Sequence, residues 1–308
     1  MAPSSVPVVT FNDGGQFEGG RVRRGGRGRG TAIAGGGIGA LLVAVLAMFF
    51  GGDLGQVTES MLGSEQQVDG GLGDGQEQFI GDCTADEANT DRECRLSATA
   101  QSLDAYWERV LPQQAGVQYV EPPVESFSGQ TTTGCGAASS ATGPFYCPPD
   151  QTVYMDLTFF DLLDTQFGAE GGPLAEMYVV AHEVGHHIEQ QIGAMDAANR
   201  RDSGPESDSV RIELMADCLA GMWVGDAATT VDPDTGVTFL EPITDEQLDQ
   251  ALSAAAAVGD DHIQQQSTGQ INPEGFTHGT SEQRMRWFAV GYNGGTLEDC
   301  NALDARQL

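Results

Sequence analysis

Apolar side chains recur at the spacing of an amphipathic helix in three parts of the chain. The predicted helices cover residues 97–111, 173–192 and 209–224. Capping boxes, at Thr244 with Gln247 and at Thr280 with Gln283, predict two further helices. Residues 153–159 alternate instead between apolar and polar side chains, which predicts a half-buried strand. The pattern therefore indicates an α+β fold that is mainly helical and has a small sheet.

A separate apolar stretch, residues 31–50, contains no charged side chain and has the length that a helix needs to cross a bilayer. It is preceded by five arginines, namely Arg21, Arg23, Arg24, Arg27 and Arg29. Because arginine-rich flanks stay on the cytoplasmic side, we expect a single-pass membrane protein with its N-terminus in the cytoplasm and the rest of the chain outside. A cleaved signal peptide is the alternative, although no small-residue cleavage site follows Phe50.

Composition divides the chain into four parts. Residues 1–30 are rich in glycine, arginine and polar residues, which predicts a disordered cytoplasmic tail. The transmembrane anchor, residues 31–50, is followed by a flexible linker over residues 51–82, where Gly, Gln, Asp and Glu dominate. The folded domain is expected over residues 83–308. Within it, the turn-forming run VDPDTGV predicts a small hairpin between residues 226 and 243.

The net charge limits the possible binding partners, and the cysteine content indicates the cellular compartment of the domain. The net charge of −31 counts against nucleic acid as a partner, because an acidic surface repels phosphate. An even number of cysteines suits disulfides in an oxidising compartment outside the cytoplasm. Sequence alone cannot choose among the possible connectivities. Short spacing favours Cys83 with Cys94 and Cys135 with Cys147, which leaves Cys218 with Cys300.

The chemistry-bearing motif lies in the second predicted helix, where His182, Glu183 and His186 form an H-E-x-x-H pattern. Residues four apart lie one turn apart on one face, so both imidazoles can bind one metal ion while Glu183 lies beside it. A zinc ion with three protein ligands keeps a position for water and lowers the pKa of that water, whose proton Glu183 can take. The alternative is a pair of histidines buried in a helical core without a metal.

The third ligand is predicted on the next long helix. The metzincin extension of the motif is absent, because positions 189 and 192 are Glu189 and Ile192. Glu213 and Asp217 lie one turn apart in an otherwise apolar stretch, where an unpaired carboxylate is costly. We assign Glu213 as the third ligand and Asp217 as the carboxylate that accepts a hydrogen bond from His182. Solvent-exposed acids on a helix are the alternative.

Four runs of sequence resemble the family of membrane-anchored bacterial neutral zinc metallopeptidases, namely VYMDLTFFD, YVVAHEVGHHIEQ, RIELMADCLAGMW and FTHGTSEQRMRWF. The resemblance covers the anchor and essentially the whole domain. More distantly, H-E-x-x-H followed by E-x-x-x-D is similar to the gluzincins, whose fold places an active-site helix beneath a small sheet. The resemblance implies a zincin domain, a Zn²⁺ cofactor and a peptide or protein as substrate.

The run THGTSEQR is similar in spacing to a T-H-P…R segment of membrane-associated gluzincin peptidases, although Gly279 stands where those carry proline. This similarity makes His278 a candidate donor of a hydrogen bond to the oxyanion. Arg284 is expected to orient substrate or to support its helix. A surface or core histidine is the alternative at position 278. His187 lies about 140° around the helix from the first histidine of the motif, so we expect it to pack rather than to bind the ion.

The predicted function is hydrolysis of peptide bonds by zinc-activated water, with Glu183 as general base. We expect the substrate to pair with an edge strand at residues 153–159. One alternative is a catalytically silent, zinc-stabilised membrane adaptor or protein-interaction module, and another is an enzyme that hydrolyses small non-peptide amides. Loss of Glu183 or of a ligand would favour the adaptor, and the sequence retains all of them.

Overall fold

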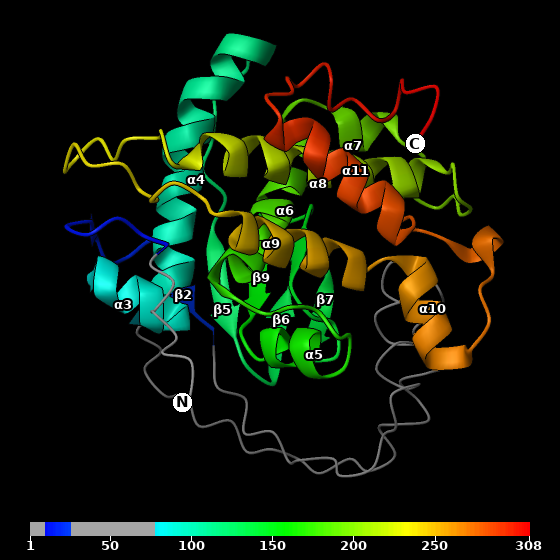
Figure 1. Cartoon of the computed structure of the whole chain (residues 1–308), viewed down its shortest axis with the longest axis horizontal. Helices are drawn as coiled ribbons and strands as arrows, with labels where there is room; N and C mark the ends of the chain where they lie inside the picture. Colours follow the sequence, from blue (N-terminus) through cyan, green and yellow to red (C-terminus); the bar gives the residue numbers. More distant parts are fainter. Residues whose placement is uncertain (1–9, 26–77) are drawn as a thin grey trace.

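Five short strands form the main sheet of the computed structural model, which describes residues 10–25 and 78–308 (Figure 1). The strand order is β3-β2-β5-β9-β8. The three middle strands are parallel, and the outer strands β3 and β8 run antiparallel to their neighbours. The bounds are Gln78–Phe79 for β3, Val22–Arg24 for β2, Val124–Phe127 for β5, Thr152–Asp156 for β9 and Phe145–Cys147 for β8.

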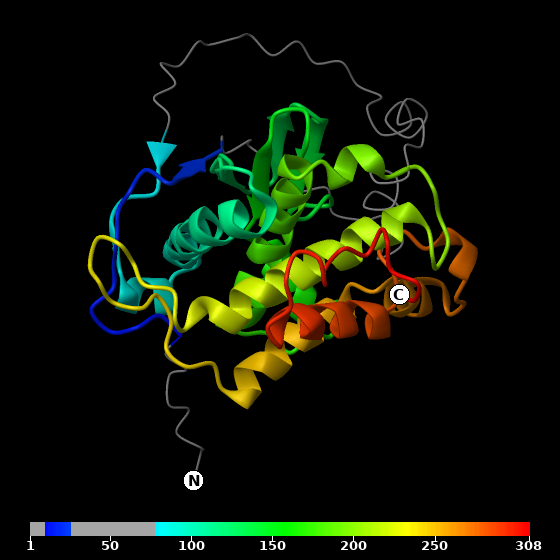
Figure 2. The same ribbon diagram turned by 90° about the horizontal axis from the view of Figure 1, so that it is seen from above.

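Helices make up most of the remaining fold and share one apolar core with the sheet. In chain order they are α3 (Ala85–Thr90), α4 (Arg92–Ala115), α5 (Phe159–Thr165), α6 (Pro173–Gln191), α7 (Ala194–Ala197), α8 (Asp208–Ala227), α9 (Asp245–Ala257), α10 (Asp260–Thr268) and α11 (Ser281–Tyr292), with a 3₁₀ turn at Pro273–Gly275. Helices α8 and α11 run side by side in both views (Figures 1 and 2). A hairpin of β6 (Gln130–Thr133) and β7 (Gly136–Ser139) stands beside the sheet.

The predicted helices are confirmed with small shifts of their ends. Residues 97–111 lie within α4, and α6 and α8 match the predictions at 173–192 and 209–224. Both capping boxes form, at the starts of α9 and α11. The predicted hairpin between residues 226 and 243 is a turn closed by an antiparallel bridge between Val231 and Thr238.

The predicted strand at 153–159 is β9, but two of its expected properties are wrong. All five residues of β9 are buried rather than alternating. Val153 and Met155 face the main core, whereas Tyr154 packs with Phe127 and Phe145 in a second cluster on the other face. The strand also lies between β5 and β8, so it offers no free edge to a substrate. The outer strand on this side of the sheet is β8.

Residues 10–25 belong to the folded domain. Phe11, Phe17 and Val22 are 0–2% exposed, and all three contribute to the main core. The pair β1 (Gln16–Phe17) and β4 (Cys83–Thr84) is antiparallel, and β2 lies between β3 and β5. The predicted disordered tail over residues 1–30 is therefore wrong for residues 10–25. The mean composition concealed a few apolar side chains that are buried by contacts with distant segments.

Three arginines that precede the predicted anchor form ion pairs with carboxylates of the domain. The pairs are Arg21 with Asp104, Arg23 with Glu125 and Arg24 with Glu93. Strands that pair in one sheet lie on one side of a membrane, so residues 22–24 share a compartment with the strands on either side of them. The predicted division, with residues 1–30 in the cytoplasm and residues 83–308 outside, stays a prediction, and a single crossing between the two parts would separate β2 from β3 and β5.

None of the helices within residues 10–25 and 78–308 is long and apolar enough to cross a membrane. The predicted anchor at residues 31–50 lies outside the described residues, as does the predicted linker up to residue 77. The predicted domain start at residue 83 is slightly late, because β3 at Gln78–Phe79 already pairs with β2.

The three predicted disulfides are confirmed: Cys83–Cys94, Cys135–Cys147 and Cys218–Cys300. The first two close short loops, whereas the third spans 82 residues and ties α8 to the segment after α11. Glycines let these two helices approach closely. A Cβ at Gly291 would lie 1.9 Å from the carbonyl oxygen of Cys218, and one at Gly221 would lie 2.1 Å from that of Phe288.

Candidate metal centre

Two neighbouring helices supply the candidate ligands. His182 and His186 lie one turn apart on α6, and Glu213 lies on α8. A Cβ at Gly185, between the two histidines, would lie 3.1 Å from the backbone of Ala216, so the missing side chain lets α8 come close to α6. This approach places the carboxylate of Glu213 against both imidazoles.

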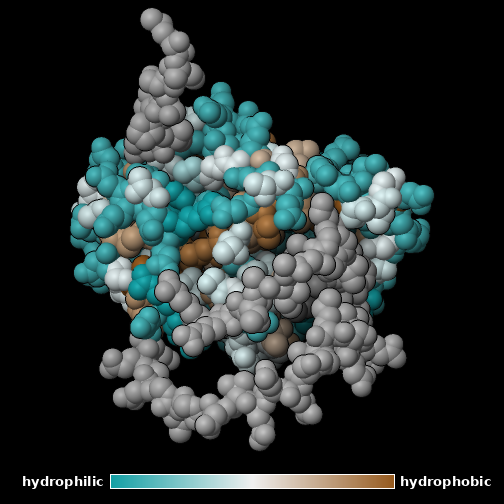
Figure 3. All heavy atoms as spheres, turned by 90° about the horizontal axis from the view of Figure 1, so that it is seen from below, coloured by the Kyte–Doolittle hydropathy of each residue, from teal (hydrophilic) through white to brown (hydrophobic). Residues whose placement is uncertain are grey.

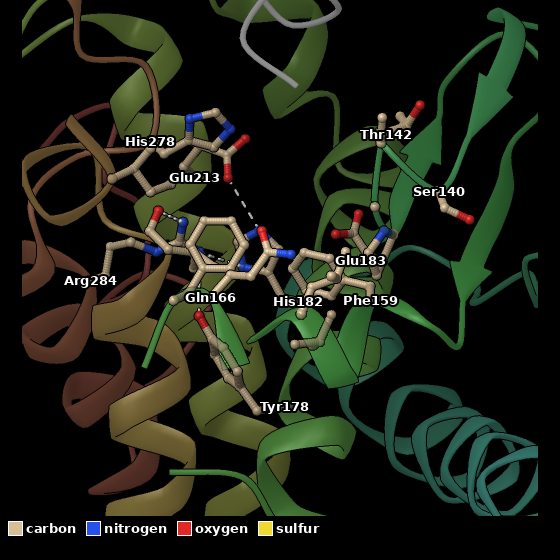
Figure 4. Close-up of a pocket in the computed structure, with 18 of the residues that line it drawn as sticks. Ser140, Thr142, Phe159, Gln166, Tyr178, His182, Glu183, Glu213, His278 and Arg284 are labelled. Atoms are coloured by element: carbon tan, nitrogen blue, oxygen red, sulfur yellow. Dashed lines mark hydrogen bonds and ion pairs between the residues drawn. The ribbon is translucent and has the colours of Figure 1, made fainter. Parts of the chain in front are cut away.

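The three side chains converge at one point. Nε2 of His182 lies 3.2 Å from Oε2 of Glu213, and Nε2 of His186 lies 3.5 Å from Oε1. The three potential ligand atoms all lie within 4.8 Å of one another, and all three residues are buried. Figure 4 shows His182 and Glu213 pointing toward each other from different helices. The sequence prediction brought together the same three residues.

The second nitrogen of each imidazole is held by a buried carboxylate. Nδ1 of His182 lies 2.9 Å from Oδ1 of Asp217, and Nδ1 of His186 lies 2.8 Å from Oε2 of Glu189. Both carboxylate side chains are fully buried. These contacts fix the ring orientations and leave Nε2 of each ring for the shared point. Asp217 was expected from the sequence, whereas Glu189 stood out there only as a departure from the metzincin motif.

Arg284 neutralises the charge of Asp217. Its Nε and Nη2 each donate to one oxygen of that carboxylate at 2.9 Å, and Nη2 also lies 3.3 Å from the hydroxyl of Tyr178. Burial acts to raise the pKa of Asp217, but Arg284 and His182 outweigh it and lower the pKa. Arg284 is 3% exposed and its donors serve this network. The geometry therefore favours the supporting role over the substrate-orienting role.

Glu183 lies beside the ligand group without belonging to it. It is 8% exposed and lines the cavities on both sides of the group. Burial raises the pKa of Glu183, while the neighbouring imidazoles and the backbone N–H of Tyr146 in β8 oppose the increase. A carboxylate with a raised pKa is suited to accept and release a proton.

His278 faces the same point from the loop before α11. Its Nδ1 lies 3.4 Å from Oδ1 of Asp260, the first residue of α10. Asp260 also accepts the backbone N–H groups of residues 277–279 through its other oxygen. Burial acts to lower the pKa of His278, but the nearby carboxylates of Glu213 and Asp260 raise it. Asp260 was not expected from the sequence, because it lies 18 positions from His278 in the chain.

His187 does not reach the ligand group. Its Nδ1 lies 3.0 Å from the hydroxyl of Tyr146, and its Nε2 lies 2.7 Å from the carbonyl oxygen of Val120. Burial lowers the pKa of His187, which favours the neutral ring that these contacts suit. The packing role predicted for it is confirmed.

The residues present fit a zinc ion. Two imidazole nitrogens and one carboxylate oxygen are a donor set that zinc binds in catalytic sites. Burial acts to raise the pKa of Glu213, but His186 and His278 outweigh it and hold the pKa well below its ordinary range. The carboxylate is therefore ionised, as a metal ligand must be. Within the described residues, these three side chains form the group that could hold a metal.

Comparison with known proteins gives the same class of site. A family profile described as "Putative neutral zinc metallopeptidase" matches residues 11–303. An uncharacterized protein of Mycobacterium tuberculosis is 50% identical over 225 residues, which cover 73% of this chain and 75% of the relative. The uncharacterized protein YpfJ of Escherichia coli K12 is 36% identical over 271 residues, or 86% of each chain. No solved structure matches the chain significantly.

Proposed function

The chain belongs to the neutral zinc metallopeptidase family, and we propose that it hydrolyses peptide bonds at the group formed by His182, His186, Glu213 and Glu183. One observation carries this proposal. Two imidazoles and one carboxylate converge on a single point, and a further carboxylate that is not a ligand lies beside them between two cavities. A metal that only stabilises the fold does not need this additional carboxylate or the open cavities.

His182, His186 and Glu213 would hold the zinc ion, with Asp217 and Glu189 fixing the two imidazole rings. A bound zinc would supply a positive charge that polarises a carbonyl group and lowers the pKa of a water molecule. Glu183 accepts a proton from the attacking water and returns it to the leaving amine. His278 donates a hydrogen bond to the oxygen that becomes negatively charged. The E-x-x-x-D pair on α8, a gluzincin-like arrangement, thus supplies one ligand and one supporting carboxylate.

The alternative of a silent zinc-stabilised adaptor is less well supported. Such a protein has no need for a general base, yet Glu183 lies beside the ligand group and lines both cavities. It also has no need for cavities that reach the ligands, whereas two such cavities are present. Hydrolysis of small amides is a narrower form of the same chemistry. Two cavities that share Glu183 and the ligands His186 and Glu213 favour instead a substrate with groups on both sides of the scissile bond.

Glu183→Gln separates hydrolysis from metal binding. The variant keeps all three ligands, so purified protein is expected to retain one equivalent of zinc by metal analysis. Its turnover of an unfolded protein substrate should fall by about 10²-fold or more, because the general base is lost. Full activity in a zinc-loaded Glu183→Gln protein would overturn the proposal. A wild-type protein that binds zinc but cleaves neither unfolded proteins nor small amides would favour the adaptor.

We also propose that the domain lies outside the cytoplasm. Three disulfides support this placement, because oxidising compartments preserve them. Attachment to a membrane through residues 31–50 remains a proposal, and a single crossing would separate β2 from β3 and β5. Attachment that preserves the sheet requires the chain to enter and leave the bilayer on one face.

A further inference from the structure

Two cavities meet at the candidate metal group. The first has a volume of about 130 Å³ and the second of about 520 Å³. They share five lining residues, namely Thr142, Glu183, His186, Glu213 and His278. A substrate bound at this group therefore has space for atoms in both cavities.

Each cavity is lined by one arginine, and the two arginines differ in their partners. In the first cavity Arg284 is paired with Asp217 through two hydrogen bonds. Apolar side chains gather in the middle of the face that carries α5 and α10, framed by hydrophilic ones (Figure 3). The second cavity is lined by Arg200, which lies in the connection between α7 and α8. The charge of Arg284 is thus neutralised within the protein, and that of Arg200 is the one to explain.

Arg200 has no partner among the residues that the structure describes. Its guanidinium forms no ion pair or hydrogen bond, although Asp196 and Asp202 lie close to it in the sequence. Acidic residues outnumber basic ones by 45 to 14 in this chain, so a carboxylate to neutralise an arginine is easily found. Arg92 and Arg109, for example, both form ion pairs. An unpaired guanidinium that lines a cavity is available to an anionic group of a ligand.

The connection that carries Arg200 is held against the helix that supplies the carboxylate ligand. The backbone N–H of Asn199 donates to Oδ2 of Asp208, in the first turn of α8, at 2.8 Å. The hydroxyl of Ser209 donates to the carbonyl oxygen of Asp202 at 2.7 Å. These two bonds lie on either side of Arg200 in the chain and fix its backbone. Binding of a ligand there costs less ordering entropy than binding to a free loop.

The charges that line the second cavity favour an anion. Its acidic side chains are Glu183 and Glu213. A bound zinc ion would offset these two negative charges, which leaves the positive charge of Arg200. Because the net charge of the chain is −31, a carboxylate is repelled by most of the protein. It is stabilised only where it comes close to an unpaired cation, as it does beside Arg200.

We propose that Arg200 binds a carboxylate of the substrate in the second cavity, so that the enzyme prefers peptides with an acidic group near the scissile bond. The inference rests on the proposed peptidase function and adds its substrate class. A guanidinium and a carboxylate form two parallel hydrogen bonds, which makes this pair both strong and directional. The carboxylate comes from the side chain of Asp or Glu or from the C-terminus of a peptide, and different peptides distinguish these sources.

The first test starts from a peptide that contains a bond which zinc-loaded wild-type protein cleaves in an unfolded protein. The peptide is blocked at both ends, and Glu or Gln is placed in turn at each position on either side of that bond. At one position kcat/KM should be about 10-fold higher with Glu than with Gln, and the difference should shrink at about 1 M salt. Peptides that end at each position with a free or an amidated C-terminus test the terminal carboxylate. If neither Glu nor a free C-terminus is favoured at any position, the assignment is overturned.

A matched pair of variants tests the arginine itself. Arg200→Gln removes the charge and should make the Glu and Gln peptides equal substrates. Arg201→Gln removes the same charge from the next residue, which is also exposed but lines neither cavity, and should keep the wild-type preference. Arg200→Glu should reverse the preference, so that a Lys peptide is cleaved about 10-fold faster than the Glu peptide. Equal effects of the two Gln variants would show a long-range effect of net charge and contradict the proposal.

A binding measurement separates this inference from the proposed function. Labelled Glu and Gln peptides are titrated against zinc-loaded Glu183→Gln protein, and fluorescence anisotropy gives both Kd values. The Glu peptide is expected to bind about 10-fold more tightly, and addition of Arg200→Gln should remove the difference. If binding shows this preference but the wild type cleaves nothing, the assignment of Arg200 stands and the peptidase function fails. If the wild type cleaves all peptides equally, the peptidase function stands and the assignment of Arg200 fails.

Discussion

Asp260, the first residue of α10, holds His278 toward the candidate metal group, with its Oδ1 3.4 Å from Nδ1 of the imidazole. The same carboxylate accepts three consecutive backbone N–H groups of the loop that carries the histidine. The backbone of this loop is thus fixed by one side chain that does not itself line either cavity, and the hydroxyl of Thr277 lies 3.0 Å from the same ring nitrogen. Asp260 is therefore a positioning residue, and His278 is the group that faces the substrate.

A double-mutant cycle tests this relationship. His278→Ala is expected to lower kcat by about 10²-fold with zinc content unchanged, because a donor to the oxyanion is lost. Asp260→Asn should lower kcat by about 10-fold through misplacement of the ring. The double variant should be no slower than His278→Ala alone, since one residue acts through the other. Additive losses would show that Asp260 affects turnover by another route.

The stability effect of Asp260 depends on pH. Burial acts to raise its pKa, but hydrogen bonds from His278 and the backbone outweigh it and lower the pKa from the ordinary value of 3.8. The ionised carboxylate therefore stabilises the fold above pH 3.8, and this contribution is lost as the pH falls through the lower folded-state pKa. Asp260→Asn should cost about 1–3 kcal/mol at pH 7 in urea unfolding. A difference between variant and wild type that stays constant down to pH 3 would contradict this account.

Glu189 should contribute to metal affinity through His186. Its Oε2 lies 2.8 Å from Nδ1 of that ring, and its Oε1 has no hydrogen-bond partner among the described residues. Glu189→Gln removes the charge that supports the imidazole, so zinc affinity should fall by about 10–100-fold in a chelator competition assay. Glu176→Gln, a matched change on the first turn of α6 outside both cavities, is expected to leave zinc affinity unchanged. Equal affinities in all three proteins would show that Glu189 serves packing alone.

Removing the metal should lower the stability of the α6–α8 contact. Three buried ligands then face one another without a cation, and a ligand that binds only the folded state stabilises it by mass action. A chelator is expected to lower Tm, and zinc should restore it. Glu213→Ala should abolish most of this zinc-dependent increase in Tm, because one of the three ligands is lost. A chelator-insensitive Tm in the wild type would argue against metal binding at this group.

Sequence patterns predicted the parts of the site whose spacing is local. The separation of His182 and His186 by one helical turn follows from the helix repeat alone. The carboxylate of Glu213 stood out because it interrupts an apolar run, and burial of that run brings it to α6. Asp260 and Glu189 gave no such signal. The contact of Asp260 depends on how α10 packs beside α11, and Glu189 occupies a helix position where a surface glutamate is ordinary.

The fold of residues 10–25 could not be predicted for a related reason. Its strands contain only two or three residues, so no alternation is visible, and glycines surround them. The arginines were interpreted as a topological signal, although three of them pair with acids that lie 69 to 102 positions away in the chain. Pairing between distant segments determines this part of the structure, and composition cannot reveal it.

The position of the arm, residues 10–25, leads to the most discriminating prediction about topology. Phe17 is 2% exposed, and Phe17→Ala should destabilise the domain by about 3–5 kcal/mol if the arm is packed as described. Phe79, at 42% exposure in β3, provides a matched control, because Phe79→Ala removes little buried surface. We expect an epitope tag placed before residue 10 of the full-length protein to lie in the same compartment as the domain. Added protease should therefore reach both the tag and the domain, or neither of them. A tag in the cytoplasm together with a domain outside it would show that β2 leaves the sheet when the protein is in the membrane. Phe17→Ala would then have little effect on the stability of the membrane-bound protein.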